Sequence, residues 1–382
     1  MSLNNTIKMS AAGSGKTWGI CNAALKLASD PKQTKRILIT TYTNKGIDSI
    51  RNEIRKQNNG VLHEQIIVKS WFQFLLSELI RPYQTYIAKI NEIRSFDFTK
   101  SYGFVNYGVV GSKSRYIDRN GYVLSNYASE LSVQLNQKSG GLVIDRLEHI
   151  YSHVFVDEIQ DLTGDDLSII DLLFRSQIET VCVGDNKQAT YKTHNTRKKK
   201  NLSGAKIWDF FESYQKEGLV RVEKNLISRR FNEDICHFAN ALFSNDNNMS
   251  TAMEEKSGHD GVFLIAAKDA KDYIDYFSPT VLKYDINTRT DSKLSYNFGQ
   301  CKGCTFDRVI IYPNGPLTKY LLKNEELKTP YKYYVATTRA RYSMVFVLPK
   351  LPQQLTNYRT EDIVLGTKII KGMKYTKETQ TT

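Results

Sequence analysis

Two stretches of the sequence carry residue types suited to holding and cleaving a phosphoanhydride. The first is Ser-Ala-Ala-Gly-Ser-Gly-Lys-Thr at residues 10–17, a P-loop pattern with Ser10 at its first position. Its two glycines let the backbone curl so that main-chain N–H groups face a phosphate. Lys16 reaches the β- and γ-phosphates, and Thr17 offers a hydroxyl to Mg²⁺. The residues predicted to bind the nucleotide are Ala12, Gly13, Ser14, Gly15, Lys16 and Thr17.

The second stretch is Phe-Val-Asp-Glu-Ile-Gln-Asp at residues 155–161. An apolar strand that ends in two carboxylates places them at the carboxyl edge of a sheet, where ligands bind. We expect Asp157 to hold Mg²⁺ through water and Glu158 to accept the proton of an attacking water. A third stretch ends in Gly184-Asp185, after which Gln188 is placed to sense the γ-phosphate and Tyr191 to stack on a base.

These residues need a parallel sheet to bring them together, and the sequence predicts one. A strand at 6–9, a helix to about 27, a strand at 36–40 and a helix at 44–56 begin an α/β sheet. Strands at 154–156 and 180–183 continue it, while the less regular stretch at about 70–150 is interpreted as a small, mostly helical insertion. We therefore predict an α/β fold with a first lobe over residues 1–218.

A second α/β run begins near Leu219 and includes apolar strands at 262–265, 281–282, 309–312 and 344–348. It predicts a second lobe over residues 219–350. The Lys- and Thr-rich segment 351–382 is interpreted as a flexible basic tail.

The amino-acid composition excludes some classes of protein and favours others. The chain has 382 residues, 41% of them hydrophobic and 24% charged, which excludes a disordered or collagen-like chain. There are 53 Lys and Arg against 40 Asp and Glu, so the partner predicted is a polyanion such as nucleic acid, and a merely basic surface is the alternative. Five cysteines, no long apolar run and no apolar leader favour a cytoplasmic protein that does not bind membranes.

Taken together, the motifs resemble those of superfamily 1 DNA helicases of the UvrD/PcrA/Rep type. The resemblance covers about residues 8–348, with the motifs in family order. Val156–Asp161 resembles the DExQD form of motif II, which is quite specific to this group. The other segments that resemble family motifs are 10–17 (I), 39–45 (Ia), 69–72 (Ib), 184–191 (III), 230–242 (IV), 301–307 (V) and 334–341 (VI).

The resemblance implies two RecA-like P-loop lobes and an ATP-dependent translocase or helicase moving 3′ to 5′ on single-stranded DNA, with RNA as the alternative strand. It implies ATP and Mg²⁺ as ligands, with Arg230 and Arg339 stabilising charge on the γ-phosphate and Gln188 sensing it. The nucleic-acid contacts that the resemblance implies are Thr41, Tyr42, Asn44, Trp71, Tyr191 and Lys302. For Trp71, core packing is the alternative to stacking on a base.

The chain also departs from the family pattern. No glutamine precedes the P-loop, so base selectivity stays open, and only about fifty-five residues separate motifs IV and V, so the second inserted subdomain is nearly absent. A compact motor of this kind is similar to UvrD-like proteins found beside nucleases in anti-phage systems such as Gabija. Alternatives are therefore a nucleic-acid-activated ATPase switch with a nuclease partner in antiviral defence, or a non-catalytic binding module. Cys301 and Cys304 are interpreted as free thiols rather than a zinc half-site or redox pair.

Overall fold

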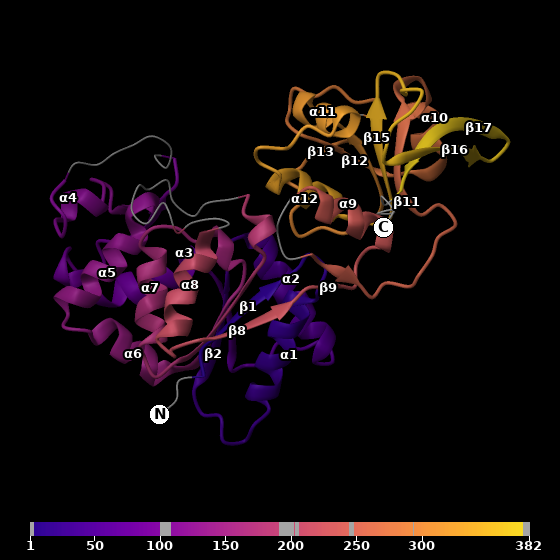
Figure 1. The fold of residues 1–382 in the computed structure, drawn as a ribbon. Coiled ribbons are helices and arrows are strands. Elements are labelled where there is room, and N and C mark those ends of the chain that lie inside the picture. The colour runs from indigo at the N-terminus through magenta and orange to yellow at the C-terminus, as the bar shows by residue number, and fades with distance from the viewer. Residues whose placement is uncertain are drawn as a thin grey trace. The chain divides into compact units, whose positions relative to one another are not determined.

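The computed structural model forms two units, each described here by itself. The first unit contains residues Met1–Ser10 and Gly15–Asn225, and the second contains Ala11–Ser14 and Leu226–Thr382. The structure describes residues 4–99, 108–190, 202, 206–243, 248–292 and 294–376. Figure 1 shows a sheet flanked by helices in each unit, as the α/β prediction requires. The sheet of the first unit is parallel, and that of the second unit is parallel except for its last two strands, which pair antiparallel.

The first unit is built on a six-stranded sheet in the order β3-β2-β6-β7-β1-β8, and every pairing in it is parallel. The strands are rich in Ile and Val because both faces of such a sheet are covered. In sheet order they are β3 (Ile66–Ser70), β2 (Arg36–Thr41), β6 (Tyr151–Val156), β7 (Glu179–Gly184), β1 (Thr6–Ser10) and β8 (Arg221–Asn225).

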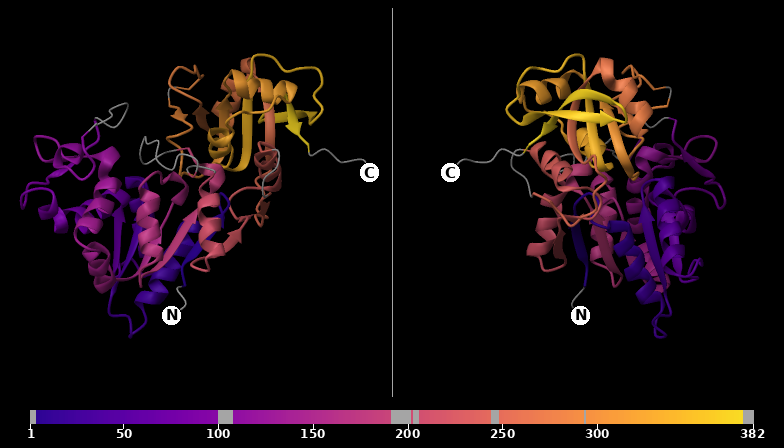
Figure 2. Two further views of the ribbon diagram at one scale, coloured as in Figure 1. Left: turned by 60° about the vertical axis from the view of Figure 1, so that its left-hand side comes forward. Right: turned by 90° about the vertical axis from the view of Figure 1, so that its right-hand side faces the viewer.

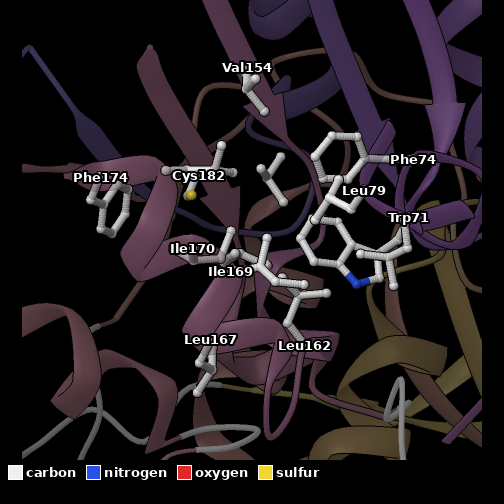
Figure 3. Close-up of a cluster of buried hydrophobic side chains, with 14 of the residues drawn as sticks. Trp71, Phe74, Leu79, Val154, Leu162, Leu167, Ile169, Ile170, Phe174 and Cys182 are labelled. Atoms are coloured by element: carbon white, nitrogen blue, oxygen red, sulfur yellow. The ribbon is translucent and has the colours of Figure 1, made fainter. Parts of the chain in front are cut away.

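Successive side chains of each strand pack against different helices because they point to opposite faces. On β2, Ile37 and Ile39 pack with helices α1 (Lys16–Ala28) and α2 (Asn44–Gln57). Leu38 points to the other face and joins the cluster around α7 (Asp166–Phe174) and α8 (Ile207–Lys216). Figure 3 shows this second cluster, in which Val154 and Cys182 of the sheet lie among Trp71, Phe74, Leu79 and the apolar residues of α7.

The segment between β3 and β6 is the predicted insertion, and it is mostly helical. It packs on the α7 face, because its Trp71, Leu79, Leu131 and Leu147 belong to the same buried cluster as α7. Its elements are α3 (Trp71–Phe74), the π-helix η1 (Leu75–Ile80), the 3₁₀-helix η2 (Arg81–Tyr86), β4 (Ser95–Asp97), α4 (Lys113–Tyr116), β5 (Tyr122–Leu124), η3 (Ser125–Tyr127), α5 (Ala128–Lys138) and α6 (Leu142–Ile150).

Two buried carboxylates, Glu78 and Asp166, connect this insertion to the rest of the first unit. We call these two residues and their hydrogen-bond partners the insertion network; the partners are Lys69, Arg146, Trp71, Ser129 and Thr163. Glu78 is 6% exposed, accepts a hydrogen bond from Lys69 and lies 3.2 Å from an Arg146 guanidinium nitrogen. Burial alone raises the pKa of Glu78, but the hydrogen bonds and charges of Lys69 and Arg146 hold that pKa below its ordinary value.

The second carboxylate of the insertion network is Asp166, which is fully buried at the start of α7. Its Oδ1 accepts hydrogen bonds from the indole Nε1 of Trp71, at 2.7 Å, and from the Ser129 hydroxyl. Its Oδ2 accepts the main-chain N–H of Thr163 at 3.1 Å. One side chain therefore joins α3, α5 and α7.

The second unit is built on a seven-stranded sheet in the order β13-β12-β14-β15-β11-β17-β16. Helices α9 (Glu233–Ala241), α11 (Gly315–Lys323) and α12 (Tyr331–Thr337) share one buried cluster with Val262 and Met344, whereas α10 (Ala267–Phe277) packs on the other face with Phe263 and Val345. The strands are β13 (Tyr296–Asn297), β12 (Thr280–Lys283), β14 (Phe306–Tyr312), β15 (Ala340–Leu348), β11 (Gly261–Ala266), β17 (Lys368–Tyr375) and β16 (Tyr358–Leu365), and β9 (Ile227–Ser228) pairs separately with β10 (Ser250–Thr251).

The prediction of a flexible tail after residue 350 is wrong for Tyr358–Tyr375. These residues form the antiparallel hairpin β16–β17, whose Leu365 and Lys368 pair across a two-residue turn, and β17 pairs with β11. The hairpin forms because Ile363, Leu365, Ile370 and Met373 are buried, while Asp362, Lys368 and Lys371 stay exposed. Figure 2 shows it in yellow at the edge of the second sheet.

The predicted boundary at residue 218 also differs from the structure. Strand β8 (Arg221–Asn225) belongs to the first sheet, because each of its residues pairs in parallel with β1. The first unit therefore continues to Asn225. In the part of the chain that the structure describes, no helix is long and apolar enough to cross a membrane.

Candidate nucleotide site

The predicted phosphate loop follows β1 and leads into α1. Gly13 and Gly15 have φ angles of 75° and 84°, a left-handed conformation that L side chains rarely adopt. Gly15 is the N-cap residue of α1, so the unsatisfied N–H groups of the first helical turn lie directly after it. The Lys16 ammonium donates to the carbonyl of Ser10 at 3.3 Å and thereby lies back over the end of β1. Strand, loop and helix thus have the geometry that binds an anion at a helix N-terminus.

The predicted carboxylates stand at the carboxyl end of the neighbouring strand β6. Asp157 is 7% exposed, and its main-chain N–H donates to the Thr40 carbonyl of β2 at 2.8 Å. Its Oδ1 accepts the main-chain N–H of Glu158 at 3.0 Å. Glu158 itself has a φ of 57°, uncommon for a residue with a side chain. The chain therefore turns sharply at Glu158, which remains partly exposed.

Strand β7 brings a third group to the same edge. The Asp185 Oδ2 lies 4.0 Å from the Lys16 ammonium and accepts the amide of Gln188 at 2.8 Å. Its main-chain N–H donates at 3.1 Å to Gln160 Oε1, and Gln160 Nε2 donates to the Glu158 carboxylate. Lys16, Asp185, Gln188, Gln160 and Glu158 thus form one connected set, which we call the edge network.

Helix α1 also places a thiol near this edge. Cys21 is fully buried, and its Sγ is 3.7 Å from the Ile50 carbonyl of α2. Burial, followed by the negative charges of Glu53 and Asp157, raises the pKa of Cys21 to about 12. The thiol therefore stays protonated at neutral pH and serves as packing between α1 and α2 rather than as a nucleophile.

The two predicted arginines lie in the second unit, where both hydrogen-bond to Thr338. Arg230 donates from Nη1 to the Thr338 carbonyl at 3.0 Å. Arg339 donates to the Thr338 hydroxyl at 3.1 Å and to the carbonyls of Val335 and Cys304 at 2.8 and 3.1 Å. Arg339 is only 1% exposed, so its guanidinium is held rigidly at the end of α12.

The residues predicted to contact nucleic acid differ in how exposed their side chains are. Thr41 is 3% exposed, because its side chain packs where a Cβ on Gly46 would otherwise lie. Tyr42 is half-buried, with its ring 6.1 Å from that of Phe72, and Asn44 is exposed at the start of α2. Lys302, in the turn before β14, is half-exposed, and Tyr191 lies outside the described residues.

The prediction that Trp71 stacks on a base is wrong. The indole is 1% exposed and donates its only N–H to Asp166. Figure 3 shows it within the apolar cluster, beside Phe74 and Leu79. The alternative interpretation, core packing, is the correct one. Cys301 is likewise buried, with its Sγ 3.0 Å from the Phe298 carbonyl, and all five cysteines are free thiols.

A family comparison decides how the first unit is classified. The family model AAA_19, described as an AAA domain, matches residues 3–194, which is half of the chain. The chain belongs to the AAA_19 family. Residues 3–194 of this AAA_19 chain contain the phosphate loop and every member of the edge network, whereas Arg230 and Arg339 lie beyond the match.

Comparison with solved structures gives a similarity to a helicase, Arterivirus nonstructural protein 10, in a complex with DNA. The sequences are 14% identical and the TM-score is 0.46. The match covers 91% of the AAA_19 chain but 61% of the viral chain. No curated protein matches this sequence.

Three members of the edge network, Lys16, Gln188 and Glu158, are predicted from the sequence. The other two, Gln160 and Asp185, have no predicted role. The sequence nevertheless carries a signal for them. Gly184 precedes Asp185, and a Cβ on it would lie 2.4 Å from Gln160 Oε1. A glycine at the end of an apolar strand indicates that another group approaches the backbone closely.

Proposed function

We propose that this AAA_19 protein is an ATP-dependent translocase or helicase on single-stranded DNA, moving 3′ to 5′. The observation that carries the proposal is the edge network, which joins the lysine of a phosphate loop to a partly exposed carboxylate across three strand ends. That arrangement suits hydrolysis of a γ-phosphate, because it holds a cation and a base at one sheet edge.

Each residue has a distinct task in this proposal. The N–H groups of the phosphate loop and Lys16 bind the β- and γ-phosphates of ATP. Glu158 accepts the proton of the attacking water, and Gln188 senses the γ-phosphate through Asp185. Arg230 and Arg339, held together at Thr338, stabilise the charge that develops on the transferred group.

The residues present also fit Mg²⁺. A hydroxyl from Thr17 and a carboxylate from Asp157 are hard oxygen ligands, the kind that Mg²⁺ prefers. The side chain of Asp157 is nearly buried at the strand end, so it is held in a fixed place. When bound, the ion neutralises charge on the β- and γ-phosphates.

For nucleic acid, we propose contacts at the carboxyl end of β2, where Tyr42 presents part of an aromatic ring and Asn44 a polar side chain. Lys302 of the second unit supplies a positive charge. The excess of Lys and Arg over the whole chain supports binding to a polyanion. Movement would follow from cycles of ATP binding and hydrolysis that alternate the grip of the two units on the strand.

The test is ATP hydrolysis by the purified chain, with and without a single-stranded DNA oligonucleotide. Hydrolysis is measured as the release of inorganic phosphate. We expect DNA to stimulate turnover, and we expect Lys16→Ala and Glu158→Gln each to remove it. RNA of the same sequence distinguishes the two kinds of strand. DNA binding without any turnover contradicts the proposal and favours a non-catalytic binding module.

A second assay separates unwinding from translocation. Tailed duplexes with a 3′ or a 5′ overhang are incubated with the protein and ATP, and displaced strand is measured. Displacement from the 3′ overhang alone fits the proposed polarity. DNA-stimulated turnover without displacement restricts the function to translocation or to an ATP-dependent switch.

A further inference from the structure

We propose that Gln160 is a positioning residue that holds the Glu158 carboxylate in place and couples it to the loop that carries Asp185. This inference rests on the proposed function, because it assigns Glu158 the role of base. It adds a fully buried residue that acts through Glu158. The geometry of its amide group carries the argument.

The orientation of the Gln160 amide is fixed by its partners. Gln160 is fully buried, and the main-chain N–H of Asp185 can only donate, so the amide oxygen must face it. The amide nitrogen therefore faces the Glu158 carboxylate, to which it donates a hydrogen bond. Replacing the nitrogen by an acceptor removes this hydrogen bond without changing the shape of the side chain.

The surrounding backbone is shaped to receive this amide. A Cβ on Gly184 would lie 2.4 Å from Gln160 Oε1 and 2.6 Å from Ile159 Cγ2, both too close for any side chain. Gly184 is thus needed for space. The end of β7 comes close to the segment after β6 at the point where Gln160 bridges them.

The bridge has a consequence for communication within the edge network. Asp185 lies 4.0 Å from the ammonium of Lys16 and binds Gln188. A shift of the Asp185 loop, when phosphate engages Lys16, moves the main-chain N–H that holds Gln160. Gln160 passes that shift to Glu158, because its two hydrogen bonds are made by the oxygen and the nitrogen of one rigid, planar amide group.

The bridge also has a chemical consequence. A donor aimed at a carboxylate favours the ionised form, the form that can accept a proton from water. In Gln160→Glu, a second carboxylate faces Glu158 in place of the donor, so the two side chains repel each other and Glu158 loses its fixed position. In Gln160→Met, the donor is lost but the volume is nearly kept.

The experiment measures kcat and KM for ATP in the full chain, with saturating single-stranded DNA. For Gln160→Glu and for Gln160→Met we expect kcat to fall about tenfold, with KM within about twofold of wild type.

The matched controls are Gln84→Glu and Gln84→Met. Gln84 is also a buried bridging glutamine of the first unit, since it donates to the Arg81 carbonyl and accepts the N–H of Ile93. We expect these variants to lower the melting temperature while kcat stays within about twofold of wild type. Values of kcat for Gln160→Glu and Gln160→Met that match wild type overturn the inference and assign Gln160 to packing.

A second measurement needs no turnover and so separates the two proposals. The side-chain amide of Gln160 is followed by NMR in protein labelled with ¹⁵N-glutamine, and its signal is identified by its loss in Gln160→Met. We expect Glu158→Ala to move this signal, because the amide nitrogen donates to the Glu158 carboxylate. An unmoved signal overturns the role of Gln160, whereas a moved signal in a protein without ATPase activity refutes only the proposed function.

Discussion

The edge network and the insertion network use the same chemistry for different ends. Each places a carboxylate among hydrogen-bond donors from segments that are distant in sequence. In the insertion network, Glu78 and Asp166 are 6% and 0% exposed and are surrounded by donors. In the edge network, Glu158 keeps part of its surface exposed. Solvent access therefore separates a carboxylate that fastens the fold from one that can react.

The contrast extends to the local backbone. Asp166 is the first residue of the regular helix α7, whereas Glu158 adopts a φ of 57° in a sharp turn. Uncommon backbone conformations in folded proteins concentrate at functional sites. Of these three carboxylates, the two buried ones, Glu78 and Asp166, hold the insertion in place, whereas Glu158, turned and partly exposed, is placed where it can react.

The largest effect is expected from removing the aromatic side chain at the centre of the insertion network. Trp71→Ala leaves a cavity and removes one of the hydrogen bonds to Asp166, so we expect the free energy of unfolding to fall by about 3–5 kcal/mol. Chemical denaturation measures it. Trp18→Ala is the control, because Trp18 is 56% exposed on α1. A small loss at Trp71 would mean that the indole is not a core element.

A pair of glutamate variants tests the comparison directly. Glu78→Ala leaves Lys69 and Arg146 without their buried carboxylate, so we expect a loss of about 3 kcal/mol in stability. Glu158→Ala is expected to change stability by less than about 1 kcal/mol while lowering ATP turnover by roughly 10²–10⁴-fold. Denaturation and phosphate release are measured on both proteins. Equal stability losses would end the distinction between the networks.

A subtler change at the second buried carboxylate should have a smaller effect. Asp166→Asn keeps the shape but turns one acceptor oxygen into a donor, which then faces the donors of Trp71, Ser129 or Thr163. We expect a loss of about 1–2 kcal/mol in the free energy of unfolding. Asp145→Asn on the exposed side of α6 serves as the reference. Identical melting curves for the two variants would refute the role of Asp166.

The smallest effect concerns pH. Lys69 and Arg146 hold the pKa of Glu78 below its ordinary value of 4.5 in the folded protein, although burial opposes them. The stabilisation from this charge is therefore complete above that value and is lost as pH falls through the folded-state pKa. We expect the difference in melting temperature between wild type and Glu78→Gln to narrow between pH 5 and pH 3. A constant difference would contradict the shift.

Much of the first unit is predictable from sequence because its signals are local. The phosphate loop, the carboxylates after β6 and the alternation of apolar strands with helices each lie within a few residues. The insertion network gives no such signal, because Trp71 and Asp166 are 95 positions apart and Glu78 and Arg146 are 68 apart. Without a fold to bring Trp71 and Asp166 together, the resemblance of residues 69–72 to motif Ib favours the interpretation of Trp71 as a nucleic-acid contact.

The error in the C-terminal region has a different cause. The lysines at 368, 371 and 374 suggest a solvated tail, yet Ile370 and Met373 between them are buried. Gly366, with a φ of 64°, and Thr367 form a two-residue turn, which is the usual connection of a tight hairpin. Exposed and buried residues alternate over 362–365, and this pattern is a better guide to the hairpin than the composition of the segment.

The hairpin β16–β17 also has a bearing on aggregation. Every residue of β11 is buried, and β17 covers the side of β11 that faces away from β15. A chain cut after β15 would leave this apolar strand with an open edge, on which another molecule can add a strand. With the hairpin in place, the outermost strand is β16, which carries Glu361 and Asp362. The last two strands thus give the second sheet a charged edge that resists self-association.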